Sequence, residues 1–434
     1  MLLTISLIFR AISLINMQAA ICVLIALLPT YLIRFKLFGL PTTFLEIMLI
    51  MVIGGWIAKK LLAKNFKKSI AEIFNKIPKI LKIIIGFFLL SATISLFISP
   101  NTLDALGIWK AYFIEPIILF LICLDVFQTK DDAKKIIGAL AISAFFVSAM
   151  AVVQKFSGWF VPYTFWGKDN VYRVTSFYGF PNAIGLYLVP IFPLLLLKLT
   201  TSWKKFTAVH KREKIKSFGK IFILILSIAF SVLAIIWSHS TGAMAAIIGG
   251  ALIIALLNKK TRWLAILLII IAGVLIYLNP APKIVSEILL KDWSGQVRIK
   301  MWQETWTMLK DNPIFGAGLS GYQTTIAPYH IWPFVEIFMY PHNFILTFWS
   351  ELGLLGLLSW IGLLIFIFKL STRTDRTIAL AVIWSVSAII IHGLVDVPYF
   401  KNDLSILFWL LFALLCLSSR QNDHDHHVNL IPKN

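Results

Sequence analysis

The sequence predicts an all-α, polytopic membrane protein with about twelve transmembrane helices. Of the 434 residues, 59% are hydrophobic and only 14% are charged, and the mean hydropathy is +0.86. This is far more apolar surface than a soluble core of this size needs. Apolar runs of roughly 17 to 25 residues, the length that a helix needs to cross a membrane, recur along the whole chain. We therefore expect residues 1–434 to form a single integral membrane domain.

Twelve apolar runs are candidates for these helices. The second run follows the first without a small-residue cleavage site between them, so we expect the N-terminus to be retained rather than removed as a signal peptide. The three cysteines each lie within an apolar run, which indicates neither a disulfide framework nor a cysteine metal site. The expected spans lie near residues 16–33, 43–62, 82–98, 107–127, 134–156, 181–198, 219–237, 240–257, 262–278, 353–369, 377–395 and 403–418.

The connections between these runs alternate between segments rich in basic residues and segments with few. Residues 59–82 contain eight lysines and residues 198–220 contain seven lysines and one arginine, whereas the loop at 99–106 contains neither. Because basic residues near span ends mark the cytoplasmic side, we expect both termini, including a tail at 419–434, to be cytoplasmic in a cytoplasmic (inner) membrane. The formal net charge of +20 then reflects topology and attraction to membrane lipids, and no nucleic acid partner is indicated.

This topology places the longest non-spanning stretch, residues 279–343 between the ninth and tenth spans, on the outer face. Within it we expect one helix, with Ser294 as its N-cap and an end at Asn312-Pro313. Tryptophans on one side of a helix are typical of a helix that lies along the membrane interface. The residues on the expected face are Arg298, Trp302, Trp306 and Leu309.

Four polar stretches lie at or just beyond span ends on the predicted outer face. A channel or a simple permease usually keeps its polar groups near mid-membrane instead. Since all four stretches face the same side, we expect them to converge on one cavity at the outer leaflet. They are "YRVTSFYGFPN" at 172–182, "WSHSTGAM" at 237–244, "GQVRIKMW" at 295–302 and "YPHNFILTFW" at 340–349.

The order and spacing of these stretches resemble those of the O-antigen ligase and O-antigen polymerase superfamily. The points of resemblance are an arginine followed after seven residues by Pro-Asn and a span, an outer-loop arginine shortly before "NPIFGAGLSGY", and then "HNFILTFWSELGLLGLL". The resemblance covers the whole layout of spans and is sharpest from residue 298 to 358. It implies a fold similar to the C-type glycosyltransferases. It also implies transfer of a glycan from a polyprenyl diphosphate, such as undecaprenyl diphosphate, without a metal ion or another cofactor.

The same resemblance implies that Arg173, Arg298 and His342 carry the chemistry. Negative charge grows on the leaving diphosphate, and two arginines, each holding phosphate oxygens through parallel hydrogen bonds, can take the place of a divalent metal. A histidine can accept the proton of the attacking hydroxyl at ordinary pH, and attack from the opposite face would invert the anomeric configuration. The residues expected to bind substrate are Arg173, Arg298, Asn182, Asn343, Trp302 and His239.

Each of the three central residues also has an interpretation without catalysis. Arg173 would anchor the start of a span at the interface, Arg298 would contact the phosphates of membrane lipids, and His342 would cap the helix that follows. The chain departs from the family pattern at one place. Where a Ser-Arg pair is common, this sequence has Ser238-His239, so a positive charge expected near the donor diphosphate is missing or supplied by histidine.

Glu351 lies inside an apolar run, where an ionised carboxylate costs about 2.5 to 3.5 kcal/mol near mid-bilayer and therefore needs a partner. The glycines at 353 and 356 predict that a short helix over 343–351 bends into the true span, which returns Glu351 toward the interface. We expect a structural ion pair, with an arginine as a candidate partner, or a helix-end role rather than catalysis.

His392 and Asp396 are four residues apart near the outer end of a span. Residues at this spacing share one side of a helix. We expect a hydrogen-bonded pair rather than a metal site, since no further ligand is evident.

Three reactions share the implied chemistry: ligation to a lipid A core in lipopolysaccharide synthesis, polymerisation of repeat units, and transfer to a protein or another glycan of the cell envelope. The sequence does not distinguish among these acceptors. Two other classes stay open, namely a transporter or flippase of a lipid-linked glycan or small anion, and a structural scaffold of the envelope. A scaffold leaves the arginines and the histidine unexplained.

Overall fold

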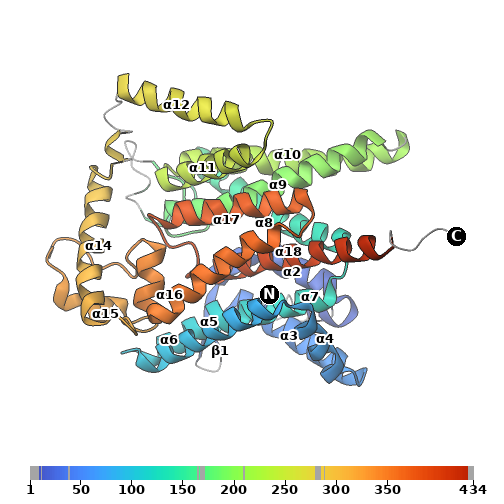
Figure 1. Cartoon of the computed structure of the whole chain (residues 1–434), viewed down its shortest axis with the longest axis horizontal. Helices are drawn as coiled ribbons and strands as arrows, with labels where there is room; N and C mark the ends of the chain where they lie inside the picture. Colours follow the sequence, from blue (N-terminus) through green and yellow to red (C-terminus); the bar gives the residue numbers. More distant parts are fainter. Residues whose placement is uncertain are drawn as a thin grey trace.

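Helices make up almost all of the structure, a computed structural model that describes residues 9–10, 12–37, 40–163, 166, 172–208, 211–278, 285–287 and 289–428. Many of the long helices run roughly alongside one another (Figure 1). In chain order the helices are α2 (Met17–Ala26), η1 (Leu28–Leu32), α3 (Phe44–Leu62), α4 (Phe66–Lys76), α5 (Lys79–Ile98), α6 (Thr102–Ile108), η2 (Trp109–Ile114), α7 (Glu115–Val126), α8 (Lys130–Ser157), α9 (Pro181–Ala208), α10 (Lys211–Trp237), α11 (Thr241–Leu257), α12 (Arg262–Leu278), α14 (Trp293–Asp311), α15 (Tyr322–Ile326), η4 (Ala327–Tyr329), α16 (Phe344–Ser371), α17 (Arg376–Gly393) and α18 (Asn402–Val428). A small antiparallel hairpin pairs β1 (Arg34–Leu37) with β2 (Leu40–Thr43).

Every expected span coincides with helical structure. Within the described part of the chain, eight helical segments are long and apolar enough to cross a membrane. Three shorter apolar helices, α2, α11 and α12, match three of the remaining predictions, and α3 matches the last. The prediction of an all-α, polytopic membrane protein is therefore confirmed.

Helix α18 forms the centre of the bundle, since 89% of its apolar segment is buried inside the protein. Its Trp409 stacks on Phe412 with ring centroids 5.4 Å apart, and its Phe408 lies 4.4 Å from the ring of Trp360 on α16. Helix α12 lies at the periphery instead, where most of its side chains are exposed (Figure 1). The aromatic core around α18 thus fixes the neighbouring helices, including α16 and α17, that carry the polar segments described below.

Helix α14 runs crosswise past the ends of the long helices (Figure 1). Its end at Asp311, with Asn312 as C-cap, agrees with the prediction, but the predicted N-cap is wrong: Asp292 occupies that position rather than Ser294. Serine and aspartate are both good caps, and a shift of two residues is within the uncertainty of a sequence pattern. Ser294 lies in the first turn and accepts a hydrogen bond of 2.6 Å from Nη1 of Arg298.

Helix α16 bends at Gly353, where φ is 68° and ψ is −174°. The bend separates the carbonyl of Ser350 from the amide of Leu354, which would pair in a straight helix. The loop after α14 satisfies both groups: Ala317 N donates to Ser350 O at 2.6 Å, and Leu354 N donates to Ile314 O at 2.9 Å. Because unpaired backbone groups are costly in an apolar environment, this exchange stabilises the bend that the sequence predicts.

Glu351, beside the bend, is fully buried. It forms no ion pair with any residue in the described part of the chain, so the expected ion pair is wrong. Its Oε2 instead accepts a hydrogen bond of 2.7 Å from the backbone amide of Ser320. A backbone dipole takes the place of the expected cation, and Glu351 joins the loop after α14 to the end of the first half of α16.

Replacing Gly353 by alanine should destabilise the protein. The added Cβ would lie 2.3 Å from Ile314 O, and the left-handed backbone alone should cost about 1 to 3 kcal/mol. The midpoint of thermal unfolding in detergent should therefore fall clearly for Gly353→Ala. The matched control is Gly362→Ala on the same helix, where the nearest neighbour is Ile84 Cγ2 at 3.5 Å. Equal midpoints for the two variants would contradict the role assigned to the bend.

Candidate functional site

A cavity of about 430 Å³ lies where α9, α11, α14 and α17 meet. Pockets of this size accommodate a small ligand or one end of a larger ligand. Four residues that the sequence predicts to bind substrate line it: Arg173, Asn182, His239 and Arg298.

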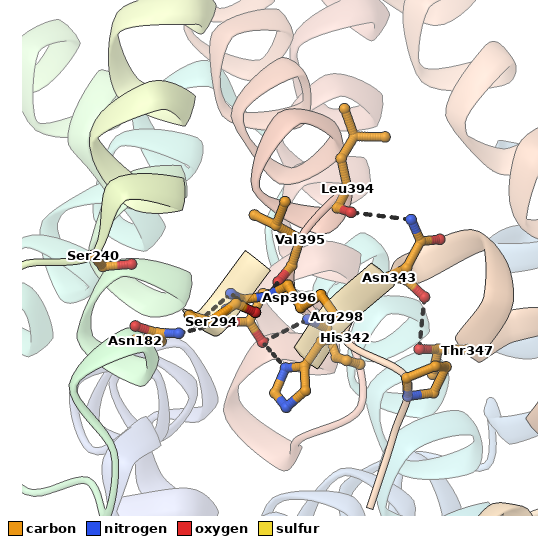
Figure 2. A network of polar contacts seen from close by, with 12 residues as sticks. Asn182, Ser240, Ser294, Arg298, His342, Asn343, Thr347, Leu394, Val395 and Asp396 are labelled. Carbon is orange, nitrogen blue, oxygen red and sulfur yellow. Dashed lines mark hydrogen bonds and ion pairs between the residues drawn. The ribbon is translucent and has the colours of Figure 1, made fainter. Parts of the chain in front are cut away.

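Three consecutive residues after α17 each bind a side chain from another part of the chain (Figure 2). The carbonyl of Leu394 accepts a hydrogen bond of 3.0 Å from Asn343 Nδ2. The carbonyl of Val395 accepts one of 2.9 Å from Nε of Arg298. The third residue is Asp396, which is only 5% exposed. This turn therefore fixes how α14 and the start of α16 approach each other.

The carboxylate of Asp396 links two of the predicted residues. His342 Nδ1 lies 3.2 Å from Oδ1, and Asn182 Nδ2 donates to Oδ2 at 3.2 Å (Figure 2). The side-chain oxygen of Asn182 accepts a hydrogen bond of 2.9 Å from Nη2 of Arg173. A continuous chain of hydrogen bonds thus connects Arg173 through Asn182 to His342, although the two ends are 169 positions apart in the sequence. His342, Trp302 and Asn343 do not line the cavity itself.

His342 is held by its neighbours in the sequence. Its φ of 46° is left-handed, a conformation that costs free energy in a residue other than glycine and occurs often at functional sites. The carbonyl of Pro341 accepts a hydrogen bond of 2.8 Å from Trp302 Nε1, and Asn343 caps α16 by accepting from two backbone amides. With Nδ1 directed at Asp396, the other ring nitrogen points away from the carboxylate (Figure 2).

Arg173 is hydrogen-bonded to the segment that contains His239, and both residues line the cavity. Nε of Arg173 donates a hydrogen bond of 2.7 Å to the carbonyl of Ser238, the residue just before His239. His239 lines the cavity and has a φ of 48°. The segment that departs from the family pattern is therefore also the segment that orients Arg173.

The charges in the site depend strongly on one another. Burial opposes ionisation of Asp396, but the hydrogen bond and the charge of His342, followed by His392 and Arg298, outweigh it and hold the pKa of Asp396 well below its usual range. Burial lowers the pKa of Arg173, and the nearby charge of Arg298 lowers it further. Two partly buried guanidinium groups that repel each other favour an anionic ligand between them.

The expected hydrogen bond between His392 and Asp396 is wrong. Helix α17 ends at Gly393, so Asp396 lies in a turn rather than on the helix, and its carboxylate faces His342. Asp396 is thus the central residue that sequence reasoning did not assign to the site. In the described part of the chain, no three His, Cys, Asp or Glu side chains are grouped as metal ligands would be.

Comparison with known proteins shows similarity to O-antigen ligases. A protein-family model described as O-antigen ligase matches residues 226–361, which include His239, Arg298, Trp302 and His342. A curated relative, the O-antigen ligase of Salmonella typhimurium, is 23% identical over 290 residues, or 62% of this chain. These two similarities support assignment to the O-antigen ligase superfamily.

The match to the Salmonella O-antigen ligase spans 65% of the length of that protein. The O-antigen ligase family model covers α11, α14 and the first half of α16, whereas Arg173, Asn182 and Asp396 lie outside it. The structure therefore adds to the O-antigen ligase region three polar residues that complete the cavity.

If the cavity binds phosphates, inorganic pyrophosphate should raise the thermal unfolding midpoint of the purified protein by mass action. Arg298→Gln should weaken pyrophosphate binding by about tenfold or more, because it removes charge-assisted hydrogen bonds. Arg298→Lys should restore binding only in part, since an ammonium cannot form the bidentate fork. Arg373→Gln, outside the cavity, serves as control, and an effect as large as that of Arg298→Gln would count against this site.

Proposed function

We propose that the protein is a membrane glycosyltransferase that moves a glycan from a polyprenyl diphosphate carrier to an acceptor hydroxyl. Assignment to the O-antigen ligase superfamily supports a glycan-transferring enzyme. The observation that carries the proposal is the hydrogen bond between His342 and the buried carboxylate of Asp396, beside a cavity with two arginines.

In the proposed reaction His342 is the general base. Because Asp396 accepts a hydrogen bond from Nδ1–H, Nε2 carries the lone pair that accepts the proton of the acceptor hydroxyl. The hydroxyl oxygen forms a bond to the anomeric carbon while the bond from that carbon to the diphosphate oxygen breaks. Asp396 then stabilises the protonated imidazole. Attack from the face opposite the leaving group inverts the configuration.

The two arginines hold the leaving group in this proposal. The diphosphate keeps the electron pair of the broken bond, and its added negative charge is stabilised by Arg173 and Arg298. Both guanidinium groups are already anchored through Nε to backbone carbonyls, at 2.7 Å and 2.9 Å. Their terminal nitrogens are therefore oriented before the substrate arrives, which lowers the cost of binding it.

The proposed reaction takes place at the outer face of the cytoplasmic membrane, with both termini in the cytoplasm. The alternation of basic loops supports this orientation. In Figure 1, α14 and α15 lie at one end of the bundle, and α18 extends toward the opposite end. Donor lipid would enter from the bilayer between helices, and a glycan, lipid or protein acceptor would approach from outside.

His342→Ala should lower the rate of glycan transfer by about 10² to 10⁴-fold, the usual contribution of a general base, with little change in donor binding. Asp396→Asn should lower the rate similarly, because an amide does not stabilise the protonated imidazole. The readout is transfer by reconstituted protein under single-turnover conditions. His330→Gln, a change elsewhere in the same outer loop, should retain the rate, and transfer at the normal rate by His342→Ala would contradict the general-base role.

The decisive experiment for the function itself is product identification. Purified protein in liposomes is incubated with a labelled undecaprenyl diphosphate glycan and with candidate acceptors, in the presence of EDTA. We expect a product with the inverted linkage and release of undecaprenyl diphosphate. Loss of activity on chelation would contradict the metal-independent reaction, and movement of intact donor across the bilayer without transfer would indicate a flippase.

A further inference from the structure

Arg173 lies in a segment between α8 and α9, residues 172–180, that belongs to neither a helix nor a strand. Such a segment holds an arginine in one orientation only if other contacts fix its backbone. We infer that Gln154, in the last turn of α8, is a positioning residue for Arg173. This inference rests on the proposed function, in which Arg173 stabilises the leaving diphosphate, and it adds a residue that does not itself line the cavity.

The side chain of Gln154 binds two neighbouring segments of the chain with both ends of its amide group. Its Oε1 accepts hydrogen bonds from the backbone amides of Thr175 at 2.6 Å and Ser176 at 2.9 Å. Its Nε2 donates to the hydroxyl of Thr175 at 3.1 Å and to the carbonyl of Phe160 at 3.0 Å. A glutamine amide has two N–H donors and an oxygen with two lone pairs, so all of its hydrogen-bonding positions are used.

These hydrogen bonds lie in the interior of the protein. Gln154, Thr175 and Ser176 each have an exposed fraction of 0%. A buried backbone amide that loses its acceptor costs free energy, because no bulk water replaces the partner. The backbone of Ser176 is also left-handed, with a φ of 54°, a conformation that persists in a residue other than glycine only where the surroundings hold it. Without the amide of Gln154, residues 175 and 176 should therefore change conformation.

Gln154 holds the segment on both sides of Arg173. Tyr172, the residue before the arginine, donates a hydrogen bond from its hydroxyl to the backbone carbonyl of Gln154. Thr175, two residues after the arginine, binds the side chain of the same glutamine. A displacement of the backbone at either residue is therefore passed directly to Arg173.

The same segment is bound to the end of α10. The amide of Val174 donates to the carbonyl of Trp237 at 3.2 Å, and Nε of Arg173 donates to the carbonyl of Ser238 at 2.7 Å. The guanidinium group thus keeps its orientation only while the segment stays in register with these two carbonyls. Since Gln154 fixes the neighbouring residues, its loss should release Arg173 from Ser238 and lower the affinity of the cavity for an anion.

The test is a double-mutant cycle on the affinity of the purified full-length protein for inorganic pyrophosphate. Gln154→Leu should lower this affinity by about fivefold, and Arg173→Gln should lower it by about tenfold or more. Because Gln154 acts through Arg173, Gln154→Leu should cause little further loss in the Arg173→Gln background. Thr175→Val removes only one hydroxyl from the network, so it should show the same dependence on Arg173 with a smaller loss.

Tyr187→Phe is the matched control. It removes a buried hydrogen bond of 2.5 Å between Tyr187 and Ser143, which also joins α8 to α9 but involves no residue of the segment around Arg173. This variant should lower the midpoint of thermal unfolding, as Gln154→Leu does, and should retain the affinity for pyrophosphate. Equal losses of affinity in Tyr187→Phe and Gln154→Leu would show a general effect on stability and would overturn the inference.

The outcomes separate the positioning role from the proposed function. If Gln154→Leu keeps the wild-type affinity, or lowers it by the same factor with and without Arg173, the positioning role is wrong and the proposed function stands. If the cycle shows the expected dependence but reconstituted wild-type protein transfers no glycan to any acceptor, the proposed function is wrong. Gln154 then still positions an arginine that binds anions.

Discussion

The site depends on one short turn, residues 394–396, and above all on the buried carboxylate that ends it. Two carbonyls and one carboxylate of this turn accept hydrogen bonds from four side chains that belong to three different parts of the chain. An ionised carboxylate in this position is stable only because donors and positive charges surround it. Removing the carboxylate would leave His342 and Asn182 without their acceptor, so the arrangement of these residues around the cavity depends on a single side chain.

Because the turn at residues 394–396 holds the polar residues of the site, no soluble domain is needed to position them. Helix α17 packs against α9 and α11, and α16 packs against α17, so the turn is attached to closely packed helices. Helix α14 adds Arg298, and the hydrogen bond from Arg298 to the carbonyl of Val395 in turn orients α14. Catalytic and binding groups on rigid elements keep their geometry better than groups on free loops.

The fold was largely predictable from the sequence, because hydropathy alone indicates where a chain crosses a membrane. The bend near Gly353 was predictable for a similar reason, since glycine next to a buried carboxylate interrupts an apolar run. The partners of the two buried acidic side chains, Asp396 and Glu351, were not predictable from the sequence. Asp396 lies four residues after His392, a spacing that suggests a local pair, but its partner is 54 residues away in the sequence. Glu351 accepts a hydrogen bond from a backbone amide. Because every residue except proline has such an amide, the sequence cannot indicate which residue is the partner.

The exchange of hydrogen bonds at Gly353 also constrains how the protein is assembled. The backbone hydrogen bond lost at Gly353 is replaced by bonds to the loop after α14. In that loop, the amide of Leu319 donates in turn to the carbonyl of Ser95 near the end of α5. None of these partners exists for a nascent α16 that enters the bilayer alone. The kink is therefore completed only after the loop that follows α14 has docked on α5, which makes packing of this loop a condition for completing the membrane domain.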